Sequence, residues 1–106
     1  MTTRAEWVRS ASPQLIADLR LYPTGQGGKT LVAEPGWGCP CCYPKTPTVY
    51  YDGWPLLQEP LSPGGHRRVG FVFSVGEEAA DIFRRAGMFY LWEGRIVGEA
   101  VVVAQE

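Results

Sequence analysis

Glycine and proline interrupt this chain so often that long regular elements are excluded over most of its length. The sequence has 13 glycines and nine prolines among 106 residues. Both residue types mark turns and element ends, so their frequency favours short strands over long helices. A chain of this length forms one domain with one small core. We therefore expect a single all-β domain.

Six stretches have the two-residue alternation, or the β-branched and aromatic content, of short strands. They lie at residues 14–22, 30–34, 46–54, 69–75, 88–93 and 95–104. The first two are joined by a turn-rich segment and predict a hairpin, and the last two predict another with its turn at Glu93 and Gly94. Asp52-Gly53 suits a tight turn at the end of the third. This spacing predicts a six-stranded closed antiparallel barrel, which leaves few exposed edges.

Two segments depart from the strand pattern. Residues 77–86 place Ala79, Ile82 and Phe83 at helical spacing, with acidic residues in the first turn and arginines in the last. This predicts about two turns of helix over one end of the barrel. Residues 1–12 mix charged and small polar side chains, so we expect a loose N-terminal arm before a barrel domain at 13–106.

Ten basic and eleven acidic side chains give the chain a formal net charge of -1. This balance supplies no overall field that would attract nucleic acid or an anionic membrane. No apolar stretch approaches the roughly 20 residues of a membrane span, and the N-terminus lacks the apolar core of a signal peptide. We therefore expect a cytoplasmic protein with reduced thiols and no membrane partner.

The segment Gly28-Lys29-Thr30 imitates the end of a phosphate-binding loop. The complete motif needs a glycine five positions before Gly28, where this chain has Pro23. Its Lys-Thr pair must also open a helix, yet Pro35 and Gly36 follow too soon. A turn explains the segment, and we expect no bound nucleotide.

All three cysteines lie within four positions, in the segment GWGCPCCYPK. Cys39, Cys41 and Cys42 supply three of the four ligands of a zinc site, and His66 or a carboxylate such as Asp52 would be the fourth. The spacing differs from the usual Cys-x-x-Cys, and a straight strand would point Cys42 away from the other two. Two interpretations stay open: a zinc- or thiol-dependent protein, or small buried thiols that line a turn.

No residue near the thiols or the single histidine marks an activated nucleophile, so we predict no catalytic residue and no enzyme activity. Basic side chains indicate another kind of site. Lys29, Arg67, Arg68 and Arg95 would form a face that binds RNA or a protein partner if the fold gathered them. Solvated surface charge is the alternative interpretation.

Four short segments occur in an order that resembles that of a known protein family. The segment GMFYLWEGRIVGEAVVV has a strand, a Glu-Gly-Arg turn, a Val-Gly pair and a valine-rich strand. Upstream, GGK at 27–29, PGWGCP and LSPGG are turns in matching positions. Over about residues 15–103 this arrangement resembles the last β-barrel domain of the translation elongation factor Tu family. The matching positions of the C-terminal motif are Phe89, Glu93, Gly94, Arg95, Val97, Gly98, Val101 and Val102.

The resemblance implies the same six-stranded barrel without the GTPase domain of elongation factors, and hence a non-catalytic binding module. In the family, the turn matched by Glu93 and Gly94 faces tRNA, so these two residues and Arg95 would carry an RNA contact. The slightly acidic charge predicts weak tRNA binding at most. We expect a protein partner, possible contact with the translation machinery, and no cofactor. The alternative is a small metal- or thiol-dependent protein centred on the cysteines, with zinc as the metal.

Overall fold

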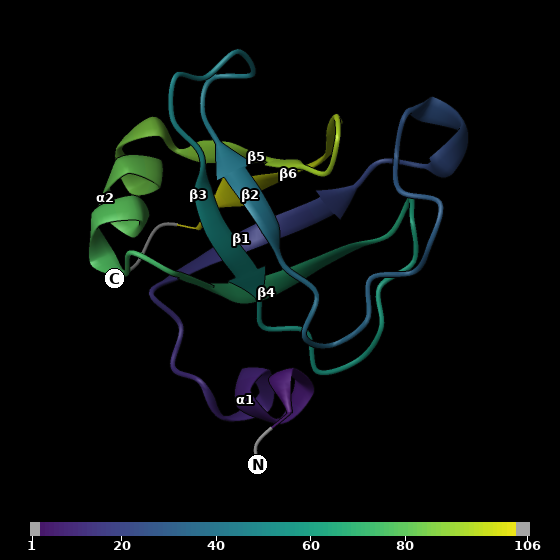
Figure 1. Cartoon of the computed structure of the whole chain (residues 1–106), viewed down its shortest axis with the longest axis horizontal. Coiled ribbons are helices and arrows are strands. Elements are labelled where there is room, and N and C mark those ends of the chain that lie inside the picture. Colours follow the sequence, from purple (N-terminus) through teal and green to yellow (C-terminus); the bar gives the residue numbers. More distant parts are fainter. Residues whose placement is uncertain (1–2, 104–106) are drawn as a thin grey trace.

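The computed structural model describes residues 3–103, and within them six strands form a closed barrel (Figure 1). The strands are β1 (Leu15–Leu21), β2 (Cys39–Cys42), β3 (Tyr51–Pro55), β4 (His66–Phe73), β5 (Met88–Trp92) and β6 (Ile96–Val102). Their order around the barrel is β1-β4-β3-β2-β5-β6, and neighbouring strands are antiparallel. The predicted six-stranded closed antiparallel barrel is confirmed.

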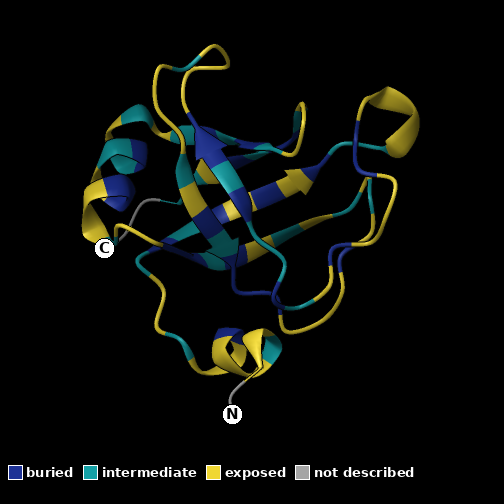
Figure 2. Cartoon of the chain, in the orientation of Figure 1, coloured by how far each residue is buried: buried dark blue, intermediate teal, exposed yellow. Residues whose placement is uncertain are grey.

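Strand β1 is the clearest case of a sequence pattern that becomes a buried face. Leu15, Ala17, Leu19 and Leu21 are buried, and the residues between them are partly or fully exposed, as Figure 2 shows by its alternating colours. Successive side chains of a strand point to opposite faces, so the apolar set lines the barrel interior. Because β1 pairs with both β4 and β6, this strand closes the barrel.

Helix α2 (Glu77–Ala86) lies against one end of the barrel and completes the core. Phe83 inserts between aromatic rings of the strands, at 4.5 Å from the Phe89 ring centroid and 5.4 Å from that of Phe73. The helix ends at Gly87, which adopts the left-handed conformation (φ 82°) that glycine reaches without steric cost. The helix predicted at 77–86 is confirmed.

The predicted hairpin between residues 14–22 and 30–34 is wrong. Residues 30–34 make only an isolated bridge, between Ala33 and Leu61, and the strand that enters the barrel is β2. Pro40 fits there because β2 pairs with β3 at Cys39, Pro40 and Cys41 but with β5 only at Cys41 and Cys42. Proline lacks the amide proton that a residue of a central strand donates. At position 40 an amide proton would have no partner on the β5 side, because β5 pairs only with Cys41 and Cys42.

The predicted turn at Asp52-Gly53 is also wrong, because both residues lie inside β3. Gly53 pairs with Cys39 on one side and with Phe73 on the other. A Cβ atom at Gly53 would lie 2.8 Å from the Phe73 ring and 2.9 Å from the Cys41 sulfur. Glycine is therefore required here for close packing and not for a turn.

The N-terminal segment is not the expected loose arm, because Arg4–Ser10 form helix α1. The Thr3 hydroxyl accepts a hydrogen bond from the Glu6 amide at 3.1 Å, which is an N-cap for the helix. Val8 is fully buried against Leu56 and Val72, on the outside of β3 and β4. Within residues 3–103 no helix has the length and apolar character to cross a membrane.

Replacing Phe83 by alanine tests the role of α2 in the core. We expect Phe83→Ala to lower the free energy of unfolding by about 3–5 kcal/mol, because it leaves a cavity among the rings of Tyr51, Phe73 and Phe89. Val75→Ala, at an exposed position just before α2, is the control and should change stability by less than about 0.5 kcal/mol. Urea unfolding followed by fluorescence measures both. Equal effects of the two variants would contradict the assignment.

Candidate functional site

The loop between β1 and β2 meets the β5–β6 turn at one end of the barrel. The loop starts beside β6, where the Tyr22 amide donates to the Val97 carbonyl at 2.9 Å. It then forms the short 3-10 helix η1 (Thr24–Gln26) and a run of residues without regular structure up to β2. We call residues 27–37 together with residues 93–95 the loop surface.

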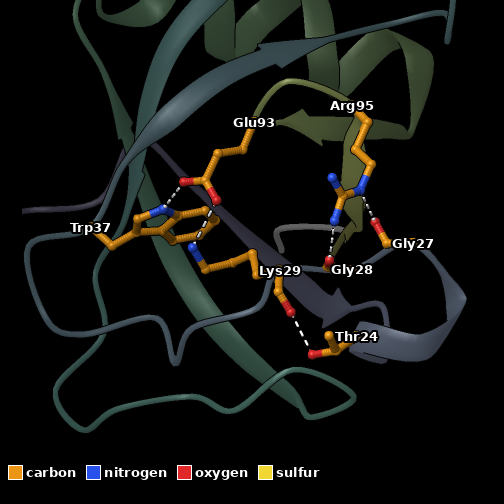
Figure 3. A network of polar contacts seen from close by, with 7 residues as sticks. All are labelled: Thr24, Gly27, Gly28, Lys29, Trp37, Glu93 and Arg95. Carbon is orange, nitrogen blue, oxygen red and sulfur yellow. Dashed lines mark hydrogen bonds and ion pairs between the residues drawn. The ribbon is translucent and has the colours of Figure 1, made fainter.

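An ion pair between the buried Lys29 and the partly exposed Glu93 holds the two parts of the loop surface together (Figure 3). Lys29 is 7% exposed, and its Nζ lies 2.9 Å from Oε1 of Glu93. The other carboxylate oxygen of Glu93 accepts a hydrogen bond from the Trp37 indole nitrogen at 2.9 Å. The Lys29 ammonium also lies 4.7 Å from the centroid of the Trp37 ring. An aromatic face attracts a cation, so three residues from two loops stabilise one another.

The protonation of Glu93 depends on these contacts. Burial by itself raises the pKa of the Glu93 carboxyl, but the hydrogen bonds from Lys29 and Trp37 and the positive charges of Lys29 and Arg95 act against it, and the net pKa is lowered. The carboxylate therefore stays ionised in the folded protein to a lower pH than in the unfolded chain. The ion pair is present at neutral pH.

Arg95 forms a second connection between the same two parts. Its guanidinium donates to the carbonyl oxygens of Gly27 at 2.7 Å and Gly28 at 2.8 Å. Gly94 lies at the tip of the β5–β6 turn, which the Glu93 amide closes by donating to the Arg95 carbonyl. The fold thus brings together four of the residues selected from the sequence, namely Lys29, Glu93, Gly94 and Arg95.

Apolar side chains stand exposed beside this network. Leu31 is 73% exposed and Val32 41%, and they line an open hollow of about 500 Å³. The remaining lining residues are Lys29, Thr30, Glu34, Trp37 and Glu93. The exposed aliphatic side chains lie next to an ordered aromatic ring and charged groups, so this hollow is the candidate binding surface of the described residues.

Arg67 and Arg68, the other two predicted basic residues, make contacts of their own. Arg67 donates to the carbonyls of Glu59 and Pro60 at 2.7 and 3.0 Å, so it fastens a loop. Arg68 pairs with Asp18 at 2.8 Å, and this hydrogen bond is the main reason that the pKa of Asp18 is lowered. Since Lys29 and Arg95 are also engaged, the predicted cations do not form a free basic face.

The predicted zinc ligands are not brought together. Cys39 and Cys41 point into the barrel, as strand alternation predicts, and Cys42 lies on the other face of β2. His66 opens β4, about 23 Å along that strand from Phe73, the residue in the same row as Cys39. Among residues 3–103, no three His, Cys, Asp or Glu side chains are placed to hold a metal ion.

The three thiols are buried, which limits their reactivity. The Cys41 sulfur donates to the Cys39 carbonyl at 3.5 Å, and burial is the first reason that the pKa of Cys41 is raised well above its ordinary value. Burial raises the pKa of Cys42 as well, by less. A thiol must lose its proton to act as a nucleophile or a metal ligand. The structure therefore favours the interpretation of these cysteines as small packing residues.

Sequence reasoning missed Trp37 and Leu31, which both line the hollow. The strand predicted at residues 30–34 includes Leu31, which the structure leaves 73% exposed. Trp37 lies between two glycines, and an isolated aromatic residue in such a segment was the signal that was available. Comparison of the chain with protein-family models, curated proteins and solved structures gave no match.

Glu93→Gln tests the ion pair that holds the loop surface. We expect the free energy of unfolding at pH 7 to fall by about 1–3 kcal/mol, since a buried ammonium loses its counter-charge and Glu93 itself is only partly buried. Glu34→Gln, in the same hollow, is the matched control and should have little effect.

The difference between wild type and Glu93→Gln should also depend on pH. Because the pKa of Glu93 is lowered on folding, its contribution is complete above the ordinary glutamate pKa and disappears as the pH falls through the lowered value. Denaturant unfolding at pH 7 and at about pH 3 measures this. A difference that grows on acidification would contradict the assignment.

Thiol reactivity tests the assignment of the cysteines. In the native protein, we expect Ellman's reagent to react with the three thiols at least about 100-fold more slowly than with free cysteine, because all three are buried. All three should react at once in denaturant. Rapid reaction of a native thiol, or stoichiometric zinc in the purified protein, would restore the metal- or thiol-dependent alternative.

Proposed function

We propose that this chain is a non-catalytic binding module that engages a protein partner through its loop surface. The observation that carries the proposal is the exposure of Leu31 and Val32 above an ordered Lys29–Glu93–Trp37 network. A protein interface typically has an apolar centre with aromatic anchors and a polar rim, and the loop surface has all three. The network also holds the surrounding groups in place before binding, which lowers the entropy lost on association.

The same contacts support a structural relationship to the last barrel of the elongation factor Tu family. Two of the motifs on which that resemblance rests are the turns at 27–29 and 93–95. These turns are joined by the Arg95 hydrogen bonds and by the Lys29–Glu93 ion pair. Two distant motifs that contact one another are more informative than either alone, because the pair depends on the fold. We therefore keep the translation machinery as the first place to look for the partner.

A protein is favoured over tRNA because the basic side chains are already engaged. Lys29 and Arg68 are paired with carboxylates, and Arg95 is bonded to carbonyl groups. Binding to a phosphate backbone needs cations that release counterions from the nucleic acid. With a net charge of -1 as well, an apolar contact is the better basis for affinity.

Affinity capture with matched variants tests the proposal. The bait is the whole chain, used to capture proteins from native lysate with and without ribonuclease. We expect a partner that survives ribonuclease and is lost with Leu31→Asp, because a charge in the apolar centre of an interface weakens binding about 100-fold or more. Val75→Asp, an equally drastic change at an exposed valine away from the loop surface, should retain the partner.

Two results would contradict the proposal. One is a partner that ribonuclease removes, which would indicate binding through RNA. The other is capture that is the same for wild type and Leu31→Asp, which would place the contact elsewhere on the barrel.

A further inference from the structure

A second exposed surface lies on the outside of the barrel, over β2 and β5. Tyr90 and Trp92 alternate with the buried Phe89 and Leu91 along β5, so they point outward. The loop between β2 and β3 adds Tyr43 and Tyr50, each 45% exposed, and Lys45. We call Tyr43, Lys45, Tyr50, Tyr90 and Trp92 the aromatic surface.

The rings of the aromatic surface form two neighbouring pairs. Tyr43 and Tyr90 are nearly parallel, with ring centroids 6.2 Å apart and 2° between the planes. Tyr50 and Trp92 are 5.5 Å apart and inclined by 53°. Alternate residues on one face of a strand are about 7 Å apart, so the two pairs stand side by side. Tyr43 and Tyr50 therefore give the surface two adjacent exposed rings.

The charges around these rings do not suit a polyanion. Glu99 lies opposite Tyr90 in the β5–β6 register, and it pairs with Arg20 at 3.7 Å and accepts from the Tyr22 hydroxyl at 2.8 Å. Lys45 stands 5.3 Å from the Tyr90 ring centroid and makes no ion pair with any residue the structure describes. One cation beside a neutralised pair gives little attraction for a chain of phosphates.

None of the hydrogen-bonding groups of the surface is limited to accepting. Lys45 and Trp92 can only donate, and the hydroxyls of Tyr43, Tyr50 and Tyr90 can donate or accept. A complementary ligand has acceptors and few donors. Proline has no amide proton, and a polyproline II segment leaves its carbonyl groups unbonded and its rings exposed for contact with aromatic faces. Such segments dock into aromatic-lined grooves with little loss of entropy.

From these observations we infer that the aromatic surface binds a neutral, proline-rich peptide segment in the polyproline II conformation. The proline rings pack against Tyr43 and Tyr50, and Lys45 and Trp92 donate to the peptide carbonyls. The aromatic surface shares no residue with the loop surface, so either proposal can fail without the other.

Nuclear magnetic resonance titration with an acetylated, amidated decaproline peptide tests the inference on the whole chain. We expect saturable shifts for residues 43–50 and 90–92 and for the Trp92 indole, and none for residues 30–34. Tyr43→Ala and Tyr50→Ala should each weaken binding about tenfold. Tyr50→Phe keeps the ring and should retain most of the affinity, which separates the contribution of the ring from that of the hydroxyl.

A matched control and a competing ligand complete the experiment. Trp7→Phe alters another partly exposed aromatic residue, which packs edge-on against Trp54 by α1, and should leave decaproline binding unchanged. The competing ligand is a ten-nucleotide oligouridylate. The inference is overturned if decaproline causes no saturable shift at millimolar concentration, or if the oligonucleotide binds the same residues more tightly.

Discussion

Closure of the barrel by β1 is the constraint on which the rest of the structure depends. β1 hydrogen-bonds to β4 on one side and β6 on the other, so the strand that comes first in the sequence joins strands from the second half. Closure removes the exposed edges that make small sheets prone to aggregate. It also encloses a space narrow enough for a few aromatic side chains, and α2 covers one end of it with Phe83. Both surfaces discussed above lie on this closed frame.

The Lys29–Glu93 ion pair fixes how the β1–β2 loop and the β5–β6 turn lie against each other in the loop surface. The two residues are 64 positions apart, and they meet because the β1–β2 loop and the β5–β6 turn emerge at the same end of the barrel. A buried ion pair is weak evidence for stability, since desolvation offsets much of the attraction. Its directional hydrogen bonds, however, define where Trp37 and the neighbouring loop residues lie. We therefore regard the pair as a source of local order more than of overall stability.

Local patterns in the sequence predicted the elements that depend on local physics. The alternation in β1, the helical spacing and caps of α2, and the β5–β6 hairpin were all read correctly from short windows. The failures came from long-range contacts: Gly53 is a glycine because Phe73 and Cys41 approach it, and residues 30–34 are not a strand because nothing pairs with them beyond Ala33. Thr3 and Glu6 form a capping pattern that was visible in the sequence and was missed.

The candidate site was predictable in part for the same reason. Charge and the family resemblance singled out Lys29, Glu93, Gly94 and Arg95, but no local pattern indicates that the first and the second form an ion pair. Trp37 and Leu31 belong to the candidate site only because the fold places them at the hollow of the loop surface. The cysteines attracted attention by their clustering, yet strand alternation was enough to place Cys39 and Cys41 together and Cys42 apart.

The β1–β2 loop is held by side-chain contacts to the β5–β6 turn and by one isolated bridge to Leu61 in the β3–β4 loop, instead of by a strand ladder, and this has an evolutionary consequence. Between its anchors at Lys29 and Trp37, the exposed residues can be exchanged without disturbing the hydrogen bonds or the packing that hold the barrel closed. Selection can therefore act on the sequence of this loop and on the folding of the barrel almost independently. A frame of this kind can diversify rapidly at this surface while its core stays the same.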